Sequence, residues 1–132
     1  MDKKIRVGAL IIKDKKILLV TSKDTTVYWS PGGGIENDES HHDALIRELK
    51  EELSLTCVAS KFYTNISYYN AFIKKDVECF YYIVETEGDL KPQSEISKYH
   101  WFSKEDIEKD PEKIGENLRK QIISKLIQER YL

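Results

Sequence analysis

The sequence predicts a single α/β domain in which helices cover both faces of a mixed β-sheet. Three observations support this fold class. The length of 132 residues suits one domain with one core. Several apolar segments have the composition of strands, and two amphipathic segments, one in mid-chain and one at the C-terminus, have the periodicity of helices. Strands and helices in this order are typical of a layered α/β/α sandwich, which we expect to span residues 1–132.

The N-terminal part of the chain contains two predicted strands. Residues 5–12 are rich in Ile, Val and Leu, and residues 17–21 have the same character. A polar stretch, residues 13–16, separates them, so the two strands are predicted to form a hairpin. Gly8 within the first strand indicates a bulge or the close approach of another group.

The next predicted element is a helix that begins after Ser40. Ser40 suits the N-cap position, and Asp43 three residues later resembles the second residue of a capping box. Leu45, Leu49 and Leu53 recur every four residues and define an apolar face that should pack on the sheet.

The remaining elements follow in the second half of the chain. Residues 56–69 and 77–85 are extended and are predicted to form a long hairpin around a polar turn. Residues 96–102 read as a short strand, and Ser103 is placed to cap a helical turn. An amphipathic pattern over residues 116–132 predicts the second main helix.

Acidic side chains are concentrated between residues 36 and 52, where seven acids stand against two bases in a chain of net charge −2. On a helical wheel Glu48, Glu51 and Glu52 fall within an arc of roughly 100° that borders the leucine face. Their mutual repulsion beside an apolar seam would be relieved by a hard divalent cation. The glycine run 32–34 would let backbone approach a metal or phosphate. A solvated acidic helix face is the simpler alternative.

The spacing of these residues favours the metal site. The chain closely resembles the Nudix box, G-x5-E-x7-R-E-U-x-E-E-x-G-U with U a bulky aliphatic residue, at every specified position but one. The departure is Ser54, where the family has a glycine that would close the helix in a left-handed conformation. Residues 29–36 and the segment after Trp101 also resemble the family. The matching residues of the box are Gly33, Glu39, Arg47, Glu48, Leu49, Glu51, Glu52 and Leu55.

The resemblance implies a Nudix-type α/β/α sandwich with a mixed sheet. It also implies metal-dependent hydrolysis of a pyrophosphate bond in a nucleoside diphosphate linked to another group. The implied cofactor is Mg²⁺, with Mn²⁺ as an alternative. A short single-domain chain suits a nucleoside triphosphate as substrate, including oxidised or non-standard ones. Dinucleoside polyphosphates, nucleotide sugars and RNA ends are alternatives.

A protein of another class with the same fold would be a catalytically silent nucleotide-binding sensor. Such a module would be free to lose the box carboxylates. Because Glu48, Glu51 and Glu52 are all present, the sequence favours the enzyme, a Nudix pyrophosphohydrolase.

The resemblance also implies roles for individual residues. Glu48, Glu51 and Glu52 are the implied metal ligands, together with the carbonyl of Gly32 or, as the alternative, of Gly33. Glu48 or Glu51 is a candidate general base. Glu95, which precedes Trp101 by six residues, resembles a late-loop acid that faces the metals in some members of the family.

Three further residues of the box are implied to be structural. Arg47 is expected to form an ion pair with Glu39 or Glu51, which would fix the loop against the helix. Gly33 and Glu39 are then structural as well. Trp29, just before the box, is expected to anchor the loop in the core, with stacking on a nucleobase as the alternative.

Composition limits the other function classes. No apolar run reaches the length of a membrane span and the N-terminus lacks a signal-peptide core, so a cytoplasmic protein is expected. Cys57 and Cys79 lack zinc-site spacing and are expected to be free, buried thiols. The net charge of −2 argues against an extended nucleic-acid surface. The expected partner is a small-molecule nucleotide, and both a monomer and a homodimer remain open.

Overall fold

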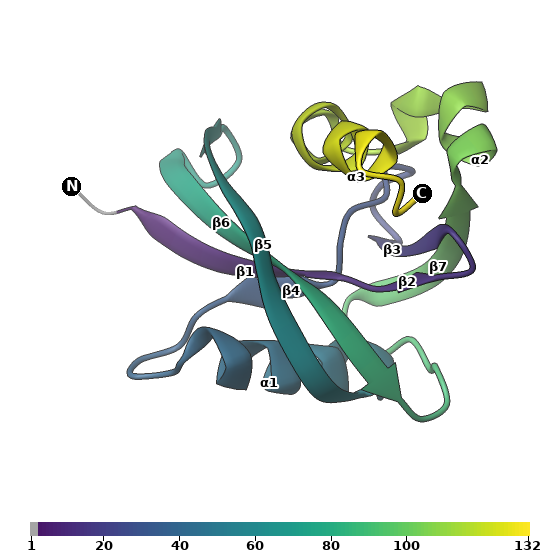
Figure 1. The fold of residues 1–132 in the computed structure, drawn as a ribbon. Helices are drawn as coiled ribbons and strands as arrows, with labels where there is room; N and C mark the ends of the chain where they lie inside the picture. Colours follow the sequence, from purple (N-terminus) through teal and green to yellow (C-terminus); the bar gives the residue numbers. More distant parts are fainter. Residues whose placement is uncertain (1–2) are drawn as a thin grey trace.

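A mixed four-stranded sheet forms the centre of the structure, a computed structural model that describes residues 3–132 (Figure 1). The strands lie in the order β4-β1-β6-β5. They are β1 (Lys4–Leu10), β4 (Gly32–Gly34), β5 (Thr56–Asn70) and β6 (Lys75–Glu87). β1 runs parallel to β6 and antiparallel to β4, and the long antiparallel hairpin predicted from the sequence is formed by β5 and β6.

The predicted hairpin of the first two strands is largely wrong. A second, three-stranded sheet contains β2 (Ile12–Lys13), β3 (Lys16–Ser22) and β7 (Ile96–Ser103). Of the predicted hairpin, only the short pairing of β2 with β3 is formed, around a turn in which Asp14 and Lys15 have φ values of 51° and 61°. β1 lies instead between β4 and β6, because its side chains are buried on both faces and such a strand needs a central position.

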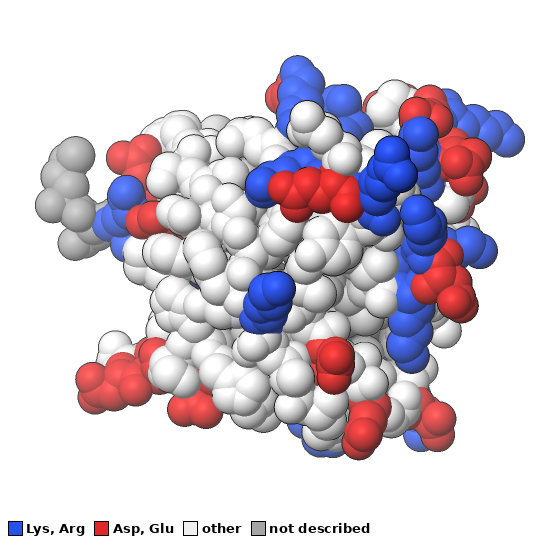
Figure 2. All heavy atoms as spheres, viewed as in Figure 1, with Lys and Arg blue, Asp and Glu red and all other residues white. Residues whose placement is uncertain are grey.

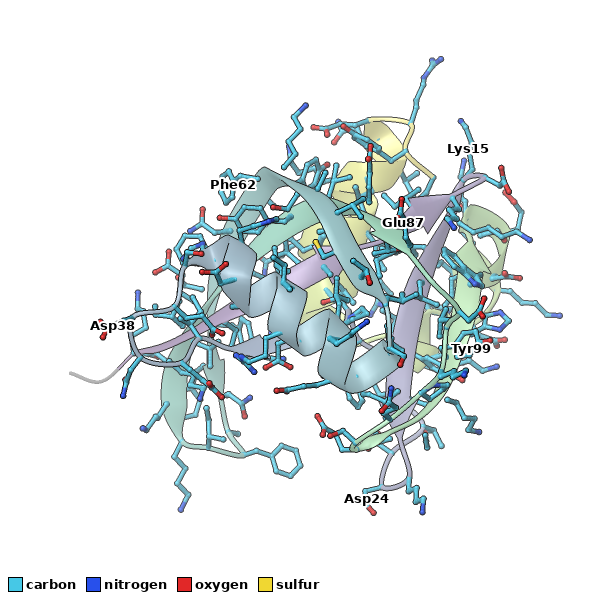
Figure 3. All side chains as sticks on the ribbon, turned by 90° about the horizontal axis from the view of Figure 1, so that it is seen from below. Lys15, Asp24, Asp38, Phe62, Glu87 and Tyr99 are labelled. Carbon is cyan, nitrogen blue, oxygen red and sulfur yellow. The ribbon has the colours of Figure 1, made fainter. Side chains whose placement is uncertain are left out.

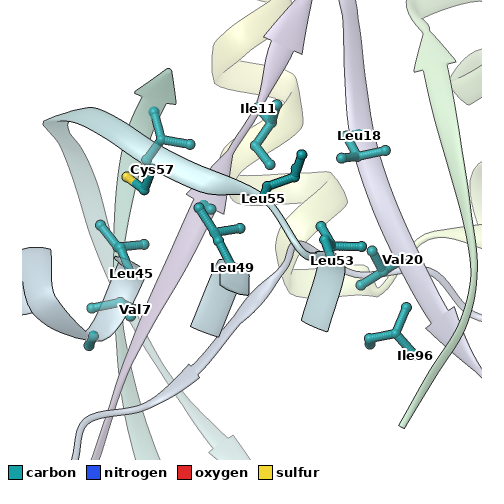
Figure 4. Close-up of a cluster of buried hydrophobic side chains, with 13 residues drawn as sticks. Val7, Ile11, Leu18, Val20, Leu45, Leu49, Leu53, Leu55, Cys57 and Ile96 are labelled. Atoms are coloured by element: carbon teal, nitrogen blue, oxygen red, sulfur yellow. The ribbon is translucent and has the colours of Figure 1, made fainter. Parts of the chain in front are cut away.

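Helices cover both faces of the central sheet, which confirms the α/β/α prediction (Figure 1). Helix α1 (His41–Leu53) lies against one face, where Leu45, Leu49 and Leu53 pack with Val7 of β1 (Figure 4). The other face is covered by the C-terminal segments η2 (Leu118–Ile123) and α3 (Ser124–Gln128). Leu10 of β1 belongs to the cluster of buried hydrophobic side chains on that face.

The C-terminal region differs in detail from its prediction. Ser103 caps α2 (Lys104–Lys109) with a full capping box, as expected, and a short 3₁₀ turn, η1 (Pro111–Lys113), follows. The last predicted helix is shorter than expected and its first part, η2, is π-helical. It ends at Gln128 because Arg130 adopts a φ of 68° and the amide of Tyr131 turns back to the carbonyl of Leu126.

Two smaller predictions concern buried groups. Gly8 marks a close approach, since a Cβ added there would lie 2.6 Å from Cε1 of Tyr81. Cys57 and Cys79 are free and buried, as expected from their spacing.

The ends of α1 follow the sequence closely. The Ser40 hydroxyl accepts a hydrogen bond from the Asp43 amide at 3.0 Å and forms the predicted N-cap. At the other end Ser54 adopts φ 61° and ψ 21°, the left-handed conformation that the family glycine would take. Its amide donates to the carbonyl of Lys50 at 3.1 Å. The turn is therefore kept, although serine adopts it at a cost.

Because of this strain, Ser54→Gly is expected to stabilise the protein by about 0.5–1 kcal/mol and to raise Tm by about 2–4 °C. The gain is limited by the loss of one hydrogen bond, which Gln93 Nε2 donates to the Ser54 hydroxyl at 2.7 Å. Thermal unfolding of the two proteins would measure the difference. Gln93→Ala removes the same hydrogen bond without relieving the strain, and it should be slightly destabilising. A lower Tm for Ser54→Gly would contradict the strain argument.

Candidate active site

An acidic cleft of about 410 Å³ opens between α1 and the glycine strand β4. Figure 3 looks onto α1, with Asp38 in the loop that leads to its N-terminal end. The cleft unites three of the predicted carboxylates, Glu48, Glu52 and Glu95, with the predicted glycines. Its lining residues are Arg6, Trp29, Gly32, Gly33, Gly34, Glu48, Glu52 and Glu95. Glu51 does not line it.

Glu52 is the most deeply buried of the carboxylates, with 3% of its surface exposed. Its Oε1 accepts a hydrogen bond from the Gly32 amide at 2.9 Å. Glu52 forms no salt bridge with any Lys or Arg of residues 3–132. Burial, reinforced by the charges of Glu48 and Glu95, raises its pKa to about 8 in the metal-free protein.

Glu48 lies one helical turn earlier and faces the same cleft. Burial raises its pKa, although a hydrogen bond from Nη1 of Arg47 to its Oε1, 2.9 Å long, opposes that shift. A Cβ added to Gly33 would lie 2.5 Å from this Oε1. The glycine at position 33 therefore leaves room for the Glu48 carboxylate.

Arg47 holds the loop before α1 against the helix. Its Nε donates to Oε2 of Glu39 at 2.7 Å and its Nη2 donates to Oε1 of the same residue at 2.9 Å. Nη2 also donates to the carbonyl of Gly34 at 3.0 Å. The predicted ion pair with Glu39 is present, and a longer contact of 3.4 Å reaches the exposed Glu51. Glu51 thus lies at the rim of this network.

The Arg47 network makes the stability of the protein depend on pH. The Arg47 guanidinium holds the pKa of Glu39 at about 2. Because this folded-state pKa is depressed, the stabilisation is present above the ordinary pKa of 4.5 and is lost as pH falls toward 2. Arg47→Met should therefore flatten the dependence of the unfolding free energy on pH between 4.5 and 2, measured by urea unfolding. Glu39→Gln should flatten it to the same extent, and an unchanged slope in either variant would contradict this assignment.

The loop that carries Glu95 is fastened to the C-terminal end of α1. The Gln93 amide donates to the carbonyl of Glu52 at 2.8 Å, and the Lys91 amide donates to the carbonyl of Leu53 at 2.9 Å. These two backbone bonds place the exposed Glu95 at the edge of the cleft, across from the glycine strand. Glu52 is thus bonded to β4 through its side chain and to the Glu95 loop through its backbone.

The chemistry of the cleft fits a hard divalent cation. Its candidate ligands are oxygens, and the buried Glu52 carboxylate forms no salt bridge with any described residue. Within residues 3–132 no three His, Cys, Asp or Glu side chains form a ready-made metal cage. Mg²⁺ does not need one, because it keeps several waters and binds through one or two carboxylates plus phosphate oxygens.

Sequence reasoning missed a second cavity, which we call the aromatic cavity. It has a volume of about 200 Å³ and shares Arg6 and Trp29 with the acidic cleft. Trp29 is half-buried and packs against the α1-side core, as expected, and it also lines both spaces. Stacking of Trp29 on a nucleobase stays a prediction. A charged residue within an apolar strand was the available signal for Arg6. The other lining residues are Val7, Ser30, Tyr68, Cys79, Tyr81, Gly115, Glu116, Asn117 and Leu118.

Charge on the molecular surface is mixed. In Figure 2 the face over β5 and β6 is largely uncharged, and Lys and Arg elsewhere on this face are interspersed with Asp and Glu.

The buried Glu52 and the half-buried Glu48 beside a glycine strand define a class of site, one suited to a divalent cation and a phosphate group. Comparison with known proteins gives the family. The family model described as "NUDIX domain" matches residues 2–125. The chain therefore belongs to the Nudix family, which confirms the resemblance seen in the sequence.

The individual relatives agree with this assignment. The CTP pyrophosphohydrolase of Escherichia coli (strain K12) is 40% identical over 60 residues, which is 42% of this chain and 44% of that protein. The chain thus aligns with less than half the length of this curated relative.

Solved structures share the fold. A NUDIX hydrolase from Nitrosomonas europaea has a TM-score of 0.83 at 22% identity, over 97% of this chain and 90% of the other. The MutT protein from Methanosarcina mazei Go1 has a TM-score of 0.80 at 23% identity, over 97% of this chain and 95% of the other.

Family membership carries general consequences. Nudix enzymes generally use divalent metal ions, and Nudix hydrolases act on small nucleotide substrates. Within residues 3–132 no helix has the length and apolar character needed to cross a membrane. The cytoplasmic location and the identity of the metal ion stay predictions.

Proposed function

We propose that the protein is a metal-dependent pyrophosphohydrolase that converts a nucleoside triphosphate and water to a nucleoside monophosphate and pyrophosphate. The observation that carries this proposal is the buried Glu52 carboxylate. It lies beside Glu48 and the glycine strand and forms no salt bridge with any described residue. A buried carboxylate of this kind is costly unless a cation compensates it.

Glu52 and Glu48 are the proposed metal ligands, with Gly32 beside them, and Mg²⁺ is the proposed metal with Mn²⁺ as an alternative. When bound, the ion polarises phosphoryl oxygens and offsets the negative charge that the acidic cleft would otherwise present to a triphosphate. Glu51 remains a predicted ligand, although its contact with Arg47 and its exposure place it outside the cleft. The Arg47 network keeps Glu48 aimed at the site.

Hydrolysis needs a group that accepts a proton from the attacking water. The oxygen of water forms a bond to a phosphorus of the pyrophosphate linkage, the bridging P–O bond breaks, and the proton passes to a carboxylate and then to solvent. Glu95 suits this task, since it lines the cleft, is exposed to water and forms no salt bridge with the described residues. Glu48 is the alternative base, and its bond to Arg47 makes it the poorer acceptor.

The aromatic cavity is the proposed site of the nucleobase. It adjoins the acidic cleft at Arg6 and Trp29, so a base in the cavity and phosphates in the cleft would belong to one ligand. Trp29, Tyr68 and Tyr81 offer aromatic faces of the kind on which bases stack. The Escherichia coli relative, named a CTP pyrophosphohydrolase, supports a nucleoside triphosphate as the substrate class.

A hydrolysis screen with Mg²⁺ and with EDTA tests the proposal. The panel contains nucleoside triphosphates including oxidised ones, ADP-ribose, dinucleoside polyphosphates, nucleotide sugars and capped RNA, with products separated by chromatography. We expect Mg²⁺-dependent release of pyrophosphate and monophosphate from nucleoside triphosphates. Turnover confined to another class would replace the substrate. No turnover, together with nucleotide binding in calorimetry, would indicate a sensor module instead.

A further inference from the structure

Arg6 is a charged residue in the middle of an otherwise apolar sheet. It lies on β1 opposite Gly34 of β4 and Cys79 of β6. Side chains of a strand alternate between faces, so Arg6 shares the face of Gly8, which lies against the Tyr81 ring. That face of the sheet carries the aromatic cavity, which Arg6 and Tyr81 both line.

The Arg6 guanidinium has no carboxylate within salt-bridge distance among the described residues. It is half-buried, and it forms no salt bridge with any carboxylate of residues 3–132. On the side of the aromatic cavity its neighbours are Tyr68, Cys79 and Tyr81, and on the side of the acidic cleft its charge acts on Glu52 without a direct ion pair. A partly desolvated guanidinium that forms no salt bridge gains when acceptor atoms of a ligand complete its hydrogen bonds.

We propose that Arg6 selects the nucleobase, and this inference rests on the function proposed above. A guanidinium presents two parallel N–H donors in a fixed geometry. It therefore matches a base edge with two adjacent acceptors, which are O2 and N3 of cytosine or O6 and N7 of guanine. Uracil presents an N3–H donor beside its O2, and adenine presents an amino group beside its N7. The aromatic walls formed by Trp29 and Tyr81 hold the ring while Arg6 reads its edge.

The same chemistry makes a prediction for oxidised guanine. In 8-oxoguanine N7 carries a hydrogen, so the acceptor pair O6 and N7 is lost. Arg6 should therefore favour GTP over 8-oxo-GTP. The proposed substrates of the wild-type enzyme are therefore triphosphates of bases with two adjacent acceptors, and 8-oxo-GTP is not among them.

Two variants and one control test the assignment. Arg6→Lys keeps the positive charge but loses the paired donors. Arg6→Gln offers one donor and one acceptor, the pair that adenine matches. Arg130→Gln removes an exposed arginine that lines neither cavity and serves as the control. The readouts are kcat/KM for CTP, GTP, UTP, ATP and 8-oxo-GTP, and the binding of the matching monophosphates by calorimetry in EDTA.

Wild-type protein should prefer CTP or GTP over UTP, ATP and 8-oxo-GTP by about 10- to 100-fold. Arg6→Lys should lower kcat/KM for CTP and GTP far more than for UTP and so remove most of that preference. Arg6→Gln should improve the relative use of ATP, and Arg130→Gln should match wild type. An equal loss for all nucleotides in Arg6→Lys would assign Arg6 to the phosphates and overturn the proposal. Wild-type turnover without preference for paired acceptors would also overturn it.

Failure of the proposed function gives a different result. In that case wild-type protein hydrolyses none of the triphosphates. The monophosphate affinities still test Arg6, because they depend on neither metal nor turnover. Equal affinities of the wild-type protein for CMP, GMP, UMP and AMP would then overturn the selection by Arg6.

Discussion

Glu52→Gln is expected to lower turnover at saturating Mg²⁺ by on the order of 100-fold or more, while the fold is kept. Glutamine retains the Oε1 acceptor for the Gly32 amide, so the contact between α1 and β4 survives. What it removes is the buried negative charge that would bind the metal. A neutral amide oxygen is a much weaker ligand for Mg²⁺ than a carboxylate.

The same substitution should stabilise the metal-free protein. The folded-state pKa of Glu52, about 8, lies above the ordinary value of 4.5. Between these two pH values the Glu52 carboxyl ionises in the unfolded chain but stays protonated in the folded protein. The free energy of unfolding therefore falls progressively as pH rises from 4.5 through 8. Glutamine never ionises. The Tm of Glu52→Gln in EDTA should therefore exceed that of wild type by a margin that grows over this range.

Two measurements on one variant thus have opposite expected signs. Activity assays with Mg²⁺ should show the loss, and thermal unfolding in EDTA between pH 5 and 8 should show the gain, on the order of a few kcal/mol. Glu108→Gln, on the exposed surface of α2, is the matched control and should change neither quantity. Wild-type turnover in Glu52→Gln would disprove the metal assignment, and a lower Tm in EDTA would disprove the pKa argument.

Gly32→Ala is expected to destabilise the protein by about 3 kcal/mol or more, and to abolish activity with it. Gly32 has a φ of 138°, which side-chain-bearing residues rarely adopt. A Cβ added there would also overlap the carbonyl oxygen of Val7 in β1. Because that atom belongs to the backbone of a central strand, the clash can be relieved only by separating β4 from β1.

Gly34→Ala is the matched comparison. Gly34 is in the same strand without a positive φ, and the nearest atom to an added Cβ is Nζ of Lys4, at 2.8 Å. A flexible lysine end can move aside, so a loss below about 1 kcal/mol is expected. Urea unfolding of both variants measures the difference. Similar losses in the two variants would show that β4 can move away from β1 at little cost. The backbone conformation of Gly32 would then not determine the stability of the protein.

Much of the fold follows from local patterns in the sequence. Ser40, the leucine repeat and the left-handed residue at position 54 determine α1 within a short stretch, and the structure agrees with all three. Strand pairing depends on contacts that local patterns do not encode. The parallel pairing of Arg6 with Cys79 joins residues far apart in the chain, which is why a local hairpin was predicted instead.

The candidate site shows the same division. The spacing of the box predicted the carboxylates, but a helical wheel placed Glu51 and Glu52 on one arc and could not separate them. In the structure Glu52 points into the cleft and Glu51 stays exposed beside Arg47. Arg47 is half-buried, because its side chain folds back onto Glu39. Only the surroundings of the helix decide these differences.

The two backbone hydrogen bonds from Lys91 and Gln93 to the end of α1 couple the exchange of these amides to metal binding at Glu52. Both amides depend on the last carbonyls of the helix that carries Glu52. A cation that steadies Glu52 should slow hydrogen–deuterium exchange at residues 91 and 93, although neither residue would touch the ion. Their exchange rates would therefore measure how much of the protein has bound metal, in the absence of substrate.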